Sequence, residues 1–181
     1  DEDDYFQSSL FTIARRRILW LLILVLANGL TTKVIAMNDE ILKEIVLLAA
    51  FIPLLIGTGG NVGAQSSTVV IRGLSTQKLK SLGAIKAVVK ESITGALLGV
   101  LMMLVVFPFA WWQGEGPLIA SAVGISLISI TTLAATTGAI LPLMFDRMRL
   151  DPALMSSPFI TTVTDIAGVF IYLSTAKWLL S

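Results

Sequence analysis

Apolar residues follow one another in five long runs that are separated by short polar segments. The runs cover approximately residues 18–36, 44–71, 88–111, 117–144 and 157–179. Each run is close to or longer than the roughly 20 residues with which an α-helix crosses about 30 Å of hydrocarbon. The pattern predicts an all-α membrane protein with five transmembrane helices per subunit.

The composition narrows the chemistry that these helices can perform. Of the 181 residues, 55% are hydrophobic and only 14% are charged, which indicates that the lipid bilayer is the surrounding medium. The sequence has no Cys and no His, which excludes thiol or imidazole catalysis and the usual zinc, haem and iron–sulfur ligands. No basic segment carries interleaved aromatics, so we expect no nucleic acid partner. We therefore expect that the protein is not an enzyme and has no catalytic residue. Any ion that it binds must be coordinated by oxygen atoms.

The positive charges predict an orientation in the membrane. Cytoplasmic flanks of transmembrane helices hold an excess of Lys and Arg. With the amino end inside, ten of the thirteen basic residues lie on the inner side, and five spans then place the carboxyl end outside. The ten are Arg15, Arg16, Arg17, Arg72, Lys78, Lys80, Lys86, Lys90, Arg147 and Arg149.

Small and hydroxyl-bearing residues inside the runs predict close helix packing. Small residues recur at four-residue spacing, which lets helix backbones approach one another in lipid. Hydroxyl groups in the fourth run are expected to bond back to their own helix rather than to line a wet passage. The small pairs are Gly59 and Gly63, Gly95 and Gly99, Ala120 and Gly124, and Ala134 and Gly138; the hydroxyl residues are Thr131, Thr132, Thr136 and Thr137.

Asp165 is the one acidic residue deep inside a predicted span. It lies about 10 Å along the helix axis from Pro158 and about 18 Å from Lys177, too far for its short side chain to reach either interface. A charged Asp at such depth costs about 3 kcal/mol and usually faces a cavity or a partner. A structural ion pair, a protonated carboxyl and a bound cation are the three explanations. Because all basic residues lie at span ends, we favour a hydrated or partly hydrated cation.

A glycine-rich segment from Gly57 to Thr68 lies inside the second predicted span. Its four glycines and six polar side chains fall within twelve residues, and Pro53 precedes them by about one turn. This composition predicts that the second helix is interrupted there. Irregular backbone survives at membrane depth only beside protein or water, and its oxygens suit a hard cation. The alternative is tight helix packing in which hydroxyl groups bond back to their own helix.

Three motifs together resemble a known family. They are FIPLLIGTGGNVGAQSST at residues 51–68, DPAL at 151–154, and TDIAG at 164–168 before Ile171 and Tyr172. These motifs look like the transmembrane domain of the MgtE family of magnesium channels, and the similarity extends over nearly all of the chain from about Arg15 onward.

The resemblance implies a homodimer in the bacterial inner membrane, with a pore along the dimer interface that the second and fifth helices line. It implies that Asp165 is the central Mg²⁺ site. Two such carboxylates, facing each other across the twofold axis, would balance one divalent ion, and Mn²⁺, Co²⁺ and Ni²⁺ remain open as further cargo. Some family members carry Asn where this chain has Ala64, so one ligand to the water shell is absent here. The other positions that the resemblance assigns to the ion are Gly57, Gly60, Thr68 and Thr161.

The resemblance also divides the chain into two parts. Residues 1–14 would be the tail of a cytoplasmic connecting helix, and residues 15–181 the pore domain; a sensor domain and paired CBS domains would precede them in family members. Two other functions fit the residues alone. One is a secondary transporter coupled to protons or sodium, in which Asp165 binds the coupling ion. The other is a structural anchor, in which Asp165 has no role.

Overall fold

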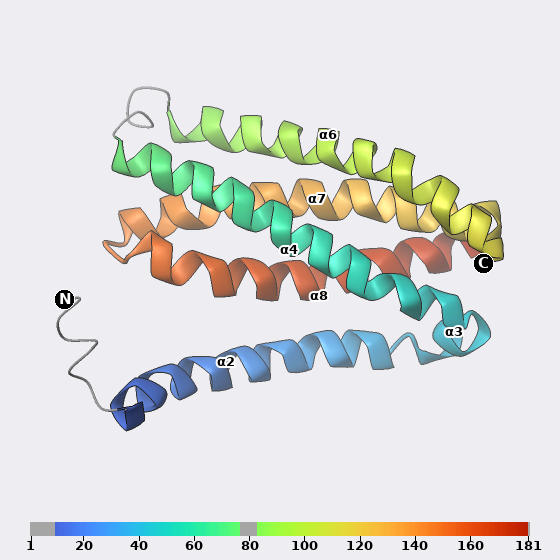
Figure 1. Cartoon of the computed structure of the whole chain (residues 1–181), viewed down its shortest axis with the longest axis horizontal. Coiled ribbons are helices and arrows are strands. Elements are labelled where there is room, and N and C mark those ends of the chain that lie inside the picture. Colours follow the sequence, from blue (N-terminus) through green and yellow to red (C-terminus); the bar gives the residue numbers. More distant parts are fainter. Residues whose placement is uncertain (1–9, 77–82, 181) are drawn as a thin grey trace.

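The computed structural model describes residues 10–76 and 83–180, and every regular element within them is a helix (Figure 1). In chain order the elements are α2 (Leu10–Ala36), α3 (Asp39–Glu44), α4 (Val46–Ser75), α6 (Ala84–Ala110), the π-helical turn η1 (Trp111–Glu115), α7 (Gly116–Arg147) and α8 (Pro152–Leu180). The predicted all-α fold is confirmed for these residues. Most of the predicted amino-terminal tail, as well as Lys78 and Lys80, lies outside them.

Four helices are long and apolar enough to cross a membrane. The first predicted span lies in α2, whose apolar part, Leu21–Ala36, is shorter than these four. Four of the five predicted spans are therefore present, and the first stays a prediction. The four are Val46–Ser75, Ala84–Gln113, Gly116–Arg147 and Met155–Leu180.

The predicted interruption of the second span is wrong, because α4 is a continuous helix of 30 residues through the glycine-rich segment. Glycine costs a helix about 1 kcal/mol relative to alanine, and packing can offset that cost. Gly59 and Gly63 are both buried against neighbouring helices. The hydroxyl of Thr68 donates to the carbonyl oxygen of Ala64 at 2.9 Å, so this polar group is satisfied within the helix.

Two of the predicted connecting loops are also helical. The segment between the first and second spans contains α3, and the segment between the third and fourth is the π-helical turn η1. Gly83 and Gly116, which lie at the starts of α6 and α7, have φ of 77° and 75°. Residues other than glycine rarely adopt these backbone angles, so glycine permits the sharp change of direction at both points.

Helices α4, α6, α7 and α8 form an antiparallel bundle with α7 at its centre (Figure 1). α7 buries 61% of its most apolar stretch, more than the other three spans. Small residues bring its neighbours close, as predicted: a Cβ added to Gly95 would lie 2.6 Å from Thr131 O, and one added to Gly138 would overlap the backbone of Gly63. Thr131, like Thr132 and Thr136, also bonds back to a carbonyl of α7.

Helix α2 lies at the side of this bundle and packs mainly on α8 (Figure 1). Val34 and Ile35, in its last turn, contact the main hydrophobic core, whereas Leu22 and Leu26 are 52% and 77% exposed. We call the end of the bundle that holds α3, η1 and the last turn of α8 the α3 end. The other end holds the starts of α2, α6 and α8.

Candidate ion site between α4 and α8

Asp165 lies near the middle of α8 and is half-buried. In the described part of the chain the one ion pair joins Lys43 to Asp39, so Asp165 has no salt bridge there. The expectation that no Lys or Arg at its depth neutralises it stays a prediction. Among those residues there is also no cluster of three or more acidic side chains that could strip and enclose a metal ion.

Two glycines of α4 set how closely α4 approaches α8. A Cβ added to Gly59 would lie 2.6 Å from Thr164 Cγ2, and one added to Gly63 would lie 2.5 Å from Ile160 Cγ2. Both distances are far below van der Waals contact, so any larger residue must displace its neighbour. The two contacts therefore fix the register of the antiparallel pair at this level of the bundle.

The register brings four predicted site residues to one side of the pair. Each follows directly after one of the four contact residues: Gly60 and Ala64 on α4, and Thr161 and Asp165 on α8. Successive residues of an α-helix turn by about 100° in a right-handed sense. When two facing helices run in opposite directions, this turn carries the next residue to the same side on both. Residues that lie about 100 positions apart in sequence thus share one face.

This shared face is open on α4. Apart from the adjacent residues and the nearby backbone of α4 itself, no described atom lies within 4 Å of a Cβ added to Gly57 or to Gly60, in contrast to the contact glycines. Ala64 and Thr68 are exposed, and with Gly57 they follow one another at spacings of seven and four residues along the helix. All five residues assigned to the ion besides Asp165 are therefore on exposed or half-buried helix surface.

The hydroxyl groups on this face keep their acceptor capacity. Thr161 Oγ1 donates to Pro158 O at 3.0 Å, and Thr68 donates in the same way to its own helix. A hydroxyl that donates its proton still has lone pairs that accept hydrogen bonds from water. The face can therefore receive the O–H groups of a hydrated cation.

The polar face of α8 ends at Asp165. Ser157, Thr161 and Asp165 follow one another at four-residue spacing in the first half of α8. Beyond them, Val169 and Tyr172 are buried, and Tyr172 Oη donates to Leu48 O at 3.1 Å. The last turn of α2 and helix α3 pack against the same core. Asp165 thus lies where the accessible polar side of α8 gives way to buried residues.

Two further polar residues of the glycine-rich segment occupy this region of α4, although the sequence analysis did not assign them to the ion. Asn61 and Gln65 are exposed, and Asn61 is one turn after Gly57. Their spacing could have identified them: Asn61 and Thr68 are seven residues, or about two helical turns, apart and therefore lie on the same side of α4. This spacing points to the ion-facing side only when the structure shows which side of the helix is buried.

Fold and site together define a multi-pass helical membrane protein that carries one unpaired carboxylate beside an oxygen-rich helix face. The family model for MgtE, described as a divalent cation transporter, matches residues 52–175. This match covers more than half of the chain, so the chain belongs to the MgtE family.

Three relatives carry the name magnesium transporter MgtE. The protein from Thermus thermophilus is 38% identical over 164 residues, 91% of this chain and 36% of the relative. The Bacillus subtilis protein is 32% identical over 176 residues, 97% of this chain and 39% of the relative. The Enterococcus faecalis protein is 33% identical over 168 residues, 91% of this chain and 36% of the relative. The chain thus spans little more than a third of their length.

Proposed function

We propose that this chain is the pore domain of a Mg²⁺ channel and that Asp165 is the central ion site. The observation that carries the proposal is the position of this carboxylate. It forms no salt bridge with the residues that the structure describes, and it shares one face with the oxygen-rich segment of α4. Names of the relatives support Mg²⁺ as the transported ion.

A second copy of the chain would complete the site. One carboxylate supplies one negative charge, whereas Mg²⁺ carries two positive charges, so two Asp165 side chains across a twofold axis would balance the ion. An accessible polar face on a membrane helix requires cover by protein or water. A homodimer whose α4 and α8 faces meet at the axis supplies both the cover and the second charge.

The ligands suit an ion that keeps its water shell. Mg²⁺ demands an octahedral arrangement of oxygen and loses water reluctantly. Hydroxyl groups of Thr68 and Thr161, with the backbone beside Gly57 and Gly60, would accept hydrogen bonds from that shell. Ala64 offers no side-chain acceptor, so this chain would hold the shell with one contact fewer than relatives that have Asn there.

The proposal also covers the orientation of the chain in the membrane and the part of the protein that regulates the pore. We infer that the amino end is cytoplasmic and the carboxyl end external in the bacterial inner membrane, because ten of the thirteen basic residues then lie inside. The α3 end would then be external. The sensor and CBS domains that the resemblance implies would regulate the pore by closing it when Mg²⁺ is bound, so we assign this regulation to residues outside 15–181.

Replacing Asp165 by Asn tests the proposal, because it removes the charge and keeps the size of the side chain. We expect Mg²⁺ uptake into liposomes to fall by about tenfold or more, which corresponds to about 1.4 kcal/mol. Asp146→Asn is the matched control, since Asp146 is exposed at the end of α7 and should leave uptake unchanged. Undiminished uptake in Asp165→Asn would overturn the proposal. Flux that follows an imposed proton or sodium gradient would instead favour a coupled transporter.

A further inference from the structure

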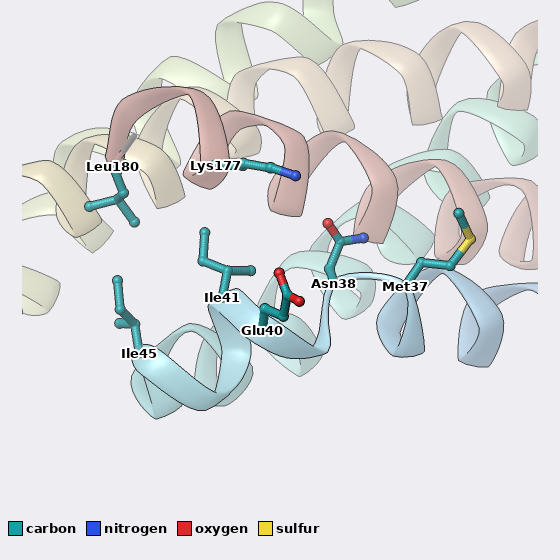
Figure 2. Close-up of a pocket in the computed structure, with 7 residues that line it drawn as sticks. All are labelled: Met37, Asn38, Glu40, Ile41, Ile45, Lys177 and Leu180. Carbon is teal, nitrogen blue, oxygen red and sulfur yellow. The ribbon is translucent and has the colours of Figure 1, made fainter.

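A pocket of about 220 Å³ lies at the α3 end, between the connection that joins α2 to α4 and the last turn of α8 (Figure 2). It is smaller than the roughly 300–1,000 Å³ of pockets that hold drug-sized ligands, so it suits a compact head group. The lining residues are Met37, Asn38, Glu40, Ile41, Ile45, Lys177 and Leu180.

The pocket combines two opposite charges that the chain does not pair. Figure 2 shows the Glu40 carboxylate directed from α3 toward α8, where Lys177 lies. Neither residue forms a salt bridge within the described ranges, although the adjacent Asp39 and Lys43 pair with each other. Asn38 donates to Val34 O at 2.8 Å, which fixes the amide and leaves its oxygen as an acceptor. A ligand that carries both an ammonium and an anionic group complements this arrangement.

The remaining lining is apolar, which favours an amphipathic ligand over a soluble ion. Ile41, Ile45 and Leu180 line the wall, and Met37 at the rim is 76% exposed. Trp178, one residue beyond Lys177, is 75% exposed, and Trp112 at the same end of the bundle is 85% exposed. Exposed tryptophans are typical of the membrane–water interface, the level at which lipid head groups lie.

We propose that this pocket binds one zwitterionic aminophospholipid that has an ethanolamine head group. Its ammonium contacts the carboxylate of Glu40, its phosphate contacts the ammonium of Lys177, and its acyl chain follows the apolar rim beside Met37. The charge complementarity and the interfacial position both select a lipid. This binding does not depend on the ion site at Asp165, because the pocket contains none of the residues assigned to the ion.

Native mass spectrometry of the full-length protein in detergent, titrated with single phospholipids, tests the proposal. We expect phosphatidylethanolamine to bind about three- to fivefold more tightly than phosphatidylcholine. The methylated ammonium of phosphatidylcholine keeps its positive charge but cannot donate a hydrogen bond to Glu40, so the difference is that of one solvent-exposed hydrogen bond. Glu40→Gln should abolish that preference while phosphatidylglycerol binding persists. Lys177→Gln should weaken the binding of all three lipids.

Asp39→Asn and Lys43→Gln are matched controls, because they alter charges on α3 that pair away from the pocket. Both should retain the preference for phosphatidylethanolamine. Persistent phosphatidylglycerol binding in Glu40→Gln also shows that this variant is folded. The proposal fails if Glu40→Gln keeps the preference, if the controls lose it, or if free phosphoethanolamine competes as well as the lipid, which would indicate a soluble ligand.

Discussion

Helix α4 carries two pairs of glycines with opposite surroundings. Gly59 and Gly63 are buried, and a methyl group on either would lie within 2.6 Å of a side chain of α8. Gly57 and Gly60, in the same segment, have no described atom within 4 Å of an added Cβ. The first pair permits close helix contact, and the second keeps an accessible face free of side chains.

The contrast shows that the packing requirement and the site requirement can share one segment of seven residues. A turn of about 100° separates each contact glycine from the residue that follows it. The same helix therefore presents its packed side to α7 and α8 and its oxygen-rich side to the face where Asp165 lies. Substitutions at the two glycine pairs should separate folding from transport.

Gly63→Ala should give the largest loss of stability. The new methyl group would lie 2.5 Å from Ile160 Cγ2 and 3.2 Å from Ala134 O, so the Ile160 side chain or one of the helices must shift. Overpacking of this kind costs about 1–3 kcal/mol. Equilibrium unfolding in mixed micelles, followed by circular dichroism, measures it. Gly57→Ala is the control, and equal unfolding midpoints for the two variants would contradict the distinction.

Tyr172→Phe should give the next largest loss of stability, because it removes a buried hydrogen bond between the proposed ion site and the α3 end. Tyr172 donates to Leu48 O at 3.1 Å, and a typical bond of this kind contributes about 1 kcal/mol. The same unfolding assay should show a lower midpoint. Thr161→Val, which removes an exposed hydroxyl that bonds only within α8, should change it less. The reverse order would contradict the larger contribution to stability assigned to the buried hydrogen bond of Tyr172.

Gly60→Ala should separate stability from transport. Alanine is a better helix former than glycine by about 1 kcal/mol, and no described atom obstructs the new methyl group, so unfolding should be unchanged or slightly harder. Mg²⁺ uptake into liposomes should fall, because the methyl group narrows the face that receives the hydrated ion. Full uptake at normal stability would remove Gly60 from the proposed site.

Ala64→Asn should have the smallest effect on stability and should sharpen ion selection. Ala64 is exposed, and the amide would add one acceptor and two donors to the open face. We expect unfolding to change by less than about 0.5 kcal/mol. Competition between Mg²⁺ and Ca²⁺ in the uptake assay should shift toward Mg²⁺, whose compact shell the extra acceptor can fix. An unchanged ratio would place this position outside the shell.

Much of the fold could be predicted from local patterns. Four apolar runs became helices of the expected length, and the small residues at four-residue spacing became helix contacts. The glycine-rich segment was misinterpreted, because glycine weakens an isolated helix whereas contacts with α7 and α8 hold α4 straight. Local propensity amounts to about 1 kcal/mol per residue, and tertiary packing overrides it.

The sequence by itself determined that the chain is helical, that it belongs in a membrane, and that its Lys and Arg residues lie near the ends of the apolar runs whereas Asp165 does not. Backbone groups in hydrocarbon must be satisfied within a segment, so long apolar runs have almost no alternative to the helix. Only the tertiary structure decided which side of α4 faces α8, and that Glu40 and Lys177 line one pocket. Such neighbours lie about a hundred or more residues apart. A local pattern of small residues predicts that helices pack closely, but it does not say which residues of which helix they meet.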